Sequence, residues 1–82
     1  MQKIPYHVTV NVKESLERYV KHRLEPGGFL RSVLENDLMG AVGRADFMNI
    51  KTIPEICSFV YNELPSDCWG DKETVDNWLK GK

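Results

Sequence analysis

The chain has 82 residues, the length of one small domain, with 11 basic and 12 acidic side chains and a formal net charge of −1. This balance excludes the strongly basic surface with which sequence-general DNA binders neutralise phosphates. Two cysteines, Cys57 and Cys68, and two histidines, His7 and His22, are too few and too scattered for a structural zinc site or a disulfide framework.

Neither a secretory signal nor an apolar run of about 20 residues is visible, so we expect a cytoplasmic protein that does not enter a membrane. Its thiols should then be reduced rather than joined in a Cys57–Cys68 disulfide. Because so short a chain buries a small core, association with further copies of itself is a common way for it to gain stability.

Residues 1–11 predict an extended N-terminal arm. Apolar side chains alternate weakly with polar ones from Ile4 to Val10, and a proline interrupts the run. Because the rest of the chain offers no second strand, we expect this arm to lie across helices rather than to join a sheet.

Two apolar stripes with helical spacing flank a Pro-Gly-Gly turn at residues 26–28. The first stripe predicts a helix over 12–23, with Asn11 as its N-cap. The second predicts one helix over 28–45, because proline and glycine suit a helix start but cannot continue the first helix. Joined by a short turn, the two should pack as a helical hairpin. The stripe residues are Val12, Leu16, Val20 and Leu24, then Leu30, Leu34, Leu38, Val42 and Ala45.

The remainder predicts two shorter helices. Residues 46–49 are expected to form a turn, after which Thr52 caps a helix that runs to about residue 63 and ends before Pro65. After an irregular corner, Asp71 caps a last helix that ends near Leu79. The whole chain, 1–82, is thus expected to form a single all-α domain.

The sequence contains no constellation typical of catalysis. No serine lies in a nucleophile elbow, no histidine has an evident partner, and the acidic cluster at residues 35–37 is what a solvated helix face carries. We therefore expect no enzymatic activity, no metal and no cofactor.

Binding is the more promising class of function. Aromatic rings interleaved with cations are typical of nucleotide recognition, because rings stack on bases and cations meet phosphates. The alternative is that these aromatic residues belong to the core and the cations to a solvated face. The residues in question are Tyr6 and His7 on the arm and Arg18, Tyr19, Lys21, His22 and Arg23 in the first helix.

Two runs carry a resemblance to a known family. They read Y-V-x-x-R-x-x-P-G-G-F-L-x-x-V-L-E-N-D-L over residues 19–38 and F-x-Y-N-x-x-P-x-x-C-W-G over residues 59–70. Both look like small proteins of tailed bacteriophages. Within that group the chain resembles, over nearly its whole length, the anti-CBASS sponges of the second-named type. Those proteins sequester the cyclic oligonucleotide messengers of host immunity without cleaving them.

The resemblance implies a helical homohexamer in the host bacterial cytoplasm. It would bind cyclic dinucleotides, such as 3′,3′-cGAMP, between pairs of protomers, and cyclic trinucleotides at separate sites. The family's binding tyrosine and lysine lie fifteen residues apart, as Tyr6 and Lys21 do here. We add His7, beside Tyr6, to this first site. As residues of the second site we expect Arg23, a phosphate donor, and Asn62, an amide that could read a base.

Two rival classes stay open at this stage. The chain could inhibit a host protein by direct contact, in which case it would form a stable complex and ignore nucleotides. A helix-turn-helix DNA binder is disfavoured, because Arg31 and Arg44 of the second helix are offset by Glu35 and Asp37.

Overall fold

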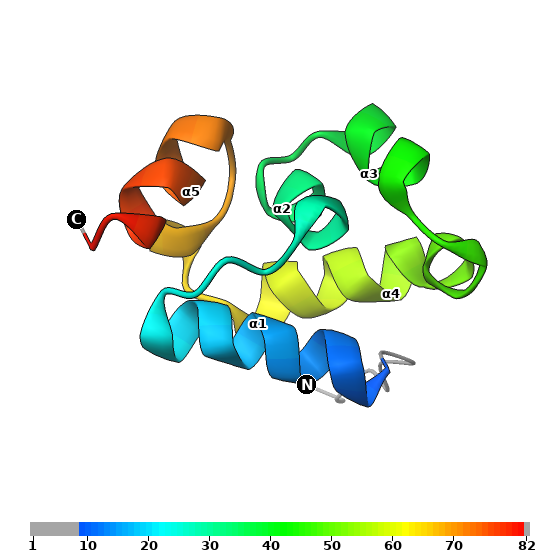
Figure 1. Ribbon diagram of the computed structural model, residues 1–82, viewed down its shortest axis with the longest axis horizontal. Coiled ribbons are helices and arrows are strands. Elements are labelled where there is room, and N and C mark those ends of the chain that lie inside the picture. Colours follow the sequence, from blue (N-terminus) through cyan, green and yellow to red (C-terminus); the bar gives the residue numbers. More distant parts are fainter. Residues whose placement is uncertain (1–8, 82) are drawn as a thin grey trace.

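The computed structural model describes residues 9–81, and all regular secondary structure in this part of the chain is helical, without a strand (Figure 1). The expected all-α class is therefore confirmed. Five α-helices and one short 3-10 helix follow one another: α1 Val10–His22, α2 Gly28–Leu34, α3 Leu38–Arg44, α4 Phe47–Glu63, η1 Ser66–Cys68 and α5 Lys72–Leu79.

Helix α1 begins earlier than the sequence pattern indicates. Thr9, not Asn11, is its N-cap, because the Thr9 hydroxyl accepts a hydrogen bond from the Val12 amide at 3.3 Å. The last two residues of the predicted arm are therefore helical, and residues 1–8 lie outside the described part. The helix ends at His22, after which Arg23 adopts a left-handed conformation with φ 54°.

The single helix predicted over 28–45 is wrong, because two short helices, α2 and α3, occupy that stretch. The break lies at the acidic cluster: Asn36 has a positive φ of 62°, and the Asp37 carboxylate accepts the Gly40 amide at 3.0 Å to cap α3. Asn36 tolerates the left-handed region better than most residues. The Asp37 and Arg44 side chains lie so close to Gly40 that a Cβ atom there would collide with them.

The third helix also starts earlier than expected. Asp46 caps α4 through the Asn49 amide at 2.7 Å, so residues 47–49, which we expected to form a turn, are the first turn of a helix. Pro54 is thus inside the helix rather than at its start. At 17 residues α4 exceeds α1 in length, so the predicted plan of a long hairpin with two shorter helices is not the observed one.

The last helix agrees with the sequence prediction. Asp71 caps α5 by accepting the Thr74 amide at 2.8 Å, and Gly81 follows the helix with a positive φ of 82°. Cys57 is exposed and Cys68 is buried, and both thiols are free.

One apolar core joins all of these segments except α3. Helices α1 and α4 run side by side, and α2, η1 and α5 lie over them (Figure 1). Hydrogen bonds reinforce the junctions: the Tyr19 hydroxyl donates to the Cys68 carbonyl at 2.6 Å, and the Gly70 amide donates to the Leu34 carbonyl at 2.7 Å. The buried core residues are Val12, Leu16, Tyr19, Leu30, Leu34, Ile56, Val60, Cys68 and Val75.

Candidate ligand-binding site

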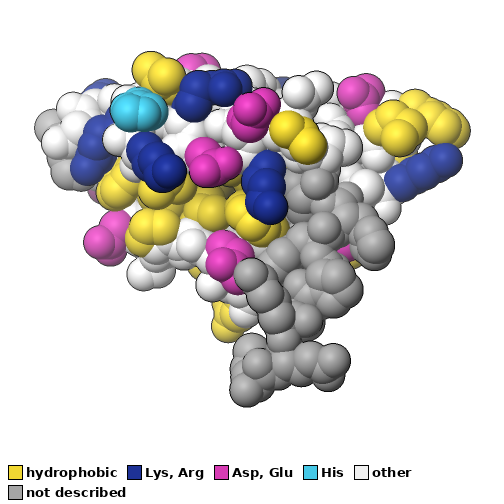
Figure 2. Space-filling model, turned by 90° about the horizontal axis from the view of Figure 1, so that it is seen from below, with side chains coloured by type: hydrophobic (Ala, Val, Ile, Leu, Met, Phe, Trp, Pro, Cys, Tyr) yellow, Lys and Arg dark blue, Asp and Glu magenta, His cyan; other side chains and the backbone are white. Residues whose placement is uncertain are grey.

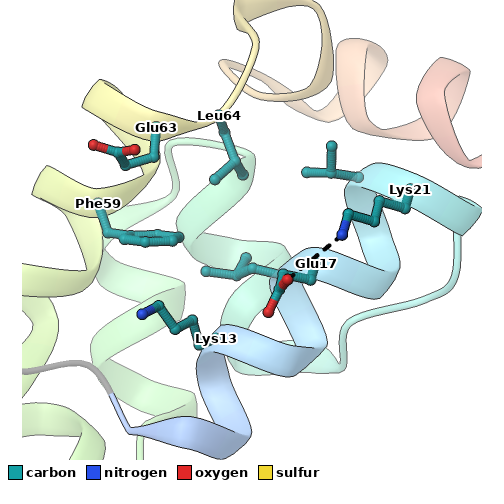
Figure 3. A pocket seen from close by; sticks show the side chains of 8 residues that line it. Lys13, Glu17, Lys21, Phe59, Glu63 and Leu64 are labelled. Atoms are coloured by element: carbon teal, nitrogen blue, oxygen red, sulfur yellow. Dashed lines mark ion pairs between the residues drawn. The ribbon is translucent and has the colours of Figure 1, made fainter.

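A groove of about 460 Å³ lies between α1 and the C-terminal end of α4 (Figure 3). Its floor is apolar and its rim is charged. The floor consists of Leu16, Val20, Phe59 and Leu64, and the rim of Lys13, Glu17, Lys21 and Glu63. Figure 2 shows this pattern on one face of the molecule, where apolar side chains are visible between basic and acidic ones.

The rim follows from the spacing of charges along α1. Lys13, Glu17 and Lys21 are four residues apart, so they project from one side of the helix (Figure 3). The opposite wall comes from α4, where the Phe59 ring is directed toward α1 (Figure 3). Leu16 and Val20 lie beside this charged row and belong to the packed core. They therefore form the apolar floor of the groove between α1 and α4.

Lys21 forms an ion pair that a ligand could replace at little cost. Its Nζ lies 3.7 Å from the Glu17 carboxylate, and the two side chains are 67% and 54% exposed. Exposed pairs of this kind contribute about 0–1 kcal/mol. An anion that enters the groove can therefore attract the Lys21 ammonium away from Glu17.

The charges and the apolar floor of the groove are suited to binding an anionic, partly apolar ligand. Lysine ammonium groups meet phosphate or carboxylate, and an apolar floor with an aromatic ring accepts a planar base. Among residues 9–81, no three His, Cys, Asp or Glu side chains gather as metal ligands. No helix in this part of the chain is long and apolar enough to cross a membrane.

Of the residues expected in the dinucleotide site, Lys21 lines the groove, whereas Tyr6 and His7 lie outside the described residues. The sequence prediction missed Lys13 and Phe59. Lys13 could have been recognised because it lies on the same side of the helix as Lys21, two turns away. Phe59 carries no comparable signal, since its place opposite α1 depends on how α4 packs.

The two residues expected in the second site have separate structural partners. Arg23 donates a hydrogen bond to the Trp78 carbonyl at 2.9 Å and stacks on the Trp78 ring. Asn62 is exposed on α4, and its side-chain amide donates to the Ser58 carbonyl of the same helix at 2.8 Å. Neither lines the α1–α4 groove.

The fold and the groove define a small all-helical protein with an amphipathic groove of mixed charge. Comparison of the chain with protein-family models, curated proteins and solved structures gives no significant match.

Proposed function

We propose that the protein is a phage-encoded sponge for cyclic oligonucleotide immune messengers. It would bind cyclic dinucleotides such as 3′,3′-cGAMP, and cyclic trinucleotides as a second class, without cleaving them, and so inhibit CBASS defence in the host bacterial cytoplasm. The single observation that supports this function best is the α1–α4 groove, where Lys13 and Lys21 flank an apolar floor that includes Phe59.

The spacing of the two lysines suits a ligand with more than one phosphate. Lys13 and Lys21 are eight residues apart, which corresponds to about 12 Å along the helix axis. Their flexible side chains can each bind one of the two phosphates of a cyclic dinucleotide, or both can bind the same phosphate. Between them, Phe59 contributes to the apolar floor, against which a base can pack.

The contacts that a single groove offers give too little binding free energy for an efficient sponge. One stacked base contributes about 1–3 kcal/mol, and two charged hydrogen bonds add about 1.5–3 kcal/mol each. The gross total of roughly 4–9 kcal/mol lies below the 12 kcal/mol or so that nanomolar binding needs. The proposal therefore includes contacts from a second protomer and from the arm that carries Tyr6 and His7, within a homo-oligomer that the resemblance implies is a hexamer.

Sequestration requires that the ligand be released unchanged. A sponge acts by mass action, so it needs high affinity and many sites but no nucleophile, general base or metal. We accordingly propose that the protein is not an enzyme.

Calorimetric titration with 3′,3′-cyclic GMP–AMP tests the proposal, followed by chromatography of the recovered ligand. We expect tight binding, intact ligand, and a loss of at least tenfold in affinity for Lys21→Ala and for Lys13→Ala. Lys80→Ala, which removes a lysine from the end of α5, is the matched control and should bind like the wild type. Tyr6→Ala, measured in the same assay, tests whether the N-terminal arm contributes to binding.

Three results would contradict the proposal. Altered ligand in the recovered fraction would make the protein an enzyme. Unchanged affinity in both groove variants would place the site elsewhere. No heat with cyclic dinucleotides or cyclic trinucleotides would favour the rival function, inhibition of a host protein by direct contact, which co-purification with host proteins would then examine.

A further inference from the structure

The stretch from α3 to the first turn of α4 exposes every large apolar side chain that it contains. Elsewhere in residues 9–81, exposed large apolar residues occur singly, at Val10, Leu24 and Tyr61. In residues 38–50 there are six, with exposures of 40–80%: Leu38, Met39, Val42, Phe47, Met48 and Ile50. Figure 1 places α3 and the start of α4 at one end of the molecule, far from α5.

Helix α3 buries little of its apolar surface within its own chain. It has seven residues, and Ala41 alone among them is buried. Isolated helices shorter than about 12 residues are marginal in water, and packing of an apolar face normally stabilises them. The large apolar side chains of α3, Leu38, Met39 and Val42, are instead 61%, 80% and 40% exposed. A partner that covers them would have to be present whenever the chain is folded, and another copy of the chain meets this condition.

The charges around the apolar residues also favour a second copy. The side chains that border them include two anions, Asp37 and Asp46, and two cations, Arg44 and Lys51. The Lys51 ammonium lies 4.2 Å from the centroid of the Phe47 ring. In a twofold dimer, this surface of one protomer packs against the same surface of its partner. Because two cations and two anions border the apolar residues, a cation of one protomer can then lie opposite an anion of its partner.

We propose that this apolar end, defined as α3 together with residues 46–51, is the surface on which a second copy of the chain docks. The inference shares with the proposed function the expectation that copies associate. It rests on the exposed side chains and not on any ligand. A wild-type oligomer that survives substitution of these side chains would overturn this inference alone, whereas a monomeric wild type would also remove the second protomer from the proposed function.

Sedimentation velocity of the purified chain tests this inference. The wild type should sediment as an oligomer of the 9.5 kDa chain, and Met39→Glu combined with Phe47→Glu should reduce it to the monomer at the same concentration. Both positions lie in the first turn of a helix, where glutamate suits the helix dipole. The control is Val10→Glu combined with Tyr61→Glu: Tyr61, like Phe47, is 73% exposed on α4, and this variant should keep the wild-type mass.

A monomeric wild type, or a double variant with the wild-type mass, would overturn the inference. Hydrogen exchange of the unmodified chain gives a second measurement should the variant fail to fold. On dilution to a concentration at which the oligomer dissociates, amides of residues 38–50 should exchange faster than those of α1, and equal effects on both would also overturn the inference. Calorimetric titration of the wild type with 3′,3′-cyclic GMP–AMP tests the proposed ligand binding separately.

Discussion

The guanidinium of Arg23 lies 3.8 Å from the centroid of the Trp78 ring, and the same group donates a hydrogen bond to the Trp78 carbonyl at 2.9 Å. Trp78 in turn donates its indole N–H to the Tyr19 carbonyl at 2.8 Å. The end of α1 and the end of α5 are thus joined by reciprocal contacts. Arg23, expected from the sequence to bind phosphate, has a role in holding the fold together.

Arg23→Ala should lower the free energy of unfolding by about 1–3 kcal/mol. The variant loses a hydrogen bond from a charged donor and a cation–π contact, and it leaves the Trp78 carbonyl without this partner. Urea denaturation followed by tryptophan fluorescence measures the change, since Trp69 and Trp78 both pack against the core. Arg23→Lys should recover part of the loss, because lysine keeps the charge but not the planar stacking geometry.

Affinity for 3′,3′-cyclic GMP–AMP should be unaffected by Arg23→Ala under conditions in which the variant stays folded. A variant of wild-type stability that no longer binds cyclic trinucleotides would confirm the sequence-based prediction that Arg23 binds ligand and would contradict a purely structural role.

Tyr19→Phe should destabilise the protein by about 1–3 kcal/mol. The Tyr19 hydroxyl is buried and donates to the Cys68 carbonyl at 2.6 Å, so its removal leaves a buried acceptor unsatisfied. Burial also raises the pKa of Tyr19 well above its usual value. Urea denaturation of the variant is compared with that of Tyr61→Phe, whose ring is 73% exposed and which should change stability by less than about 0.5 kcal/mol. Equal effects at both positions would show that the buried hydrogen bond contributes little.

Glu17→Gln should strengthen the binding of anionic ligands to the groove about two- to fivefold, because its carboxylate competes for Lys21 and repels phosphate. The gain should shrink as salt is added, since the groups are exposed. Titration calorimetry at two ionic strengths measures both effects. Glu14→Gln, on the same helix but outside the groove lining, is the control. Weaker binding by Glu17→Gln would instead identify this carboxylate as a group that accepts hydrogen bonds from the ligand.

Stability should fall as the solution is acidified below about pH 4. Lys72, with Arg31 nearby, lowers the pKa of Asp76 below its usual 3.8, and the Thr74 amide lowers that of Asp71. Both carboxylates are therefore more acidic in the folded than in the unfolded chain. Their contribution is fully present above the unfolded pKa and is lost as the pH falls through the folded values. Urea midpoints measured from about pH 6 to about pH 3 would show this loss.

Asp71→Asn separates the capping role of residue 71 from the titration of its carboxylate. Asparagine caps a helix about as well as aspartate but does not ionise. The variant should therefore keep α5 at neutral pH and show a shallower loss of stability in acid. An unchanged acid profile would exclude Asp71 as a contributor.

The sequence by itself determined the class of the fold and those helix ends that depend on neighbouring residues. The cap at Asp71 and the glycine after α5 act within a few residues, so local chemistry was sufficient to place that helix. The break at Asn36 and Asp37 is also local, but both residues suit a solvated helix face as well as a turn, and the apolar stripe continues through the break. Spacing therefore predicted one helix where there are two.

Only the tertiary structure decided which residues share a site. Lys21 and Phe59 are 38 positions apart, and they line the same groove because α4 packs beside α1. Arg23, two residues beyond Lys21, turns to Trp78 because the chain leaves α1 in a left-handed conformation. Helical periodicity tells which side of a helix is apolar, but not which other helix will cover it. The lining of the groove and the uncovered face of α3 follow from that choice of packing partners.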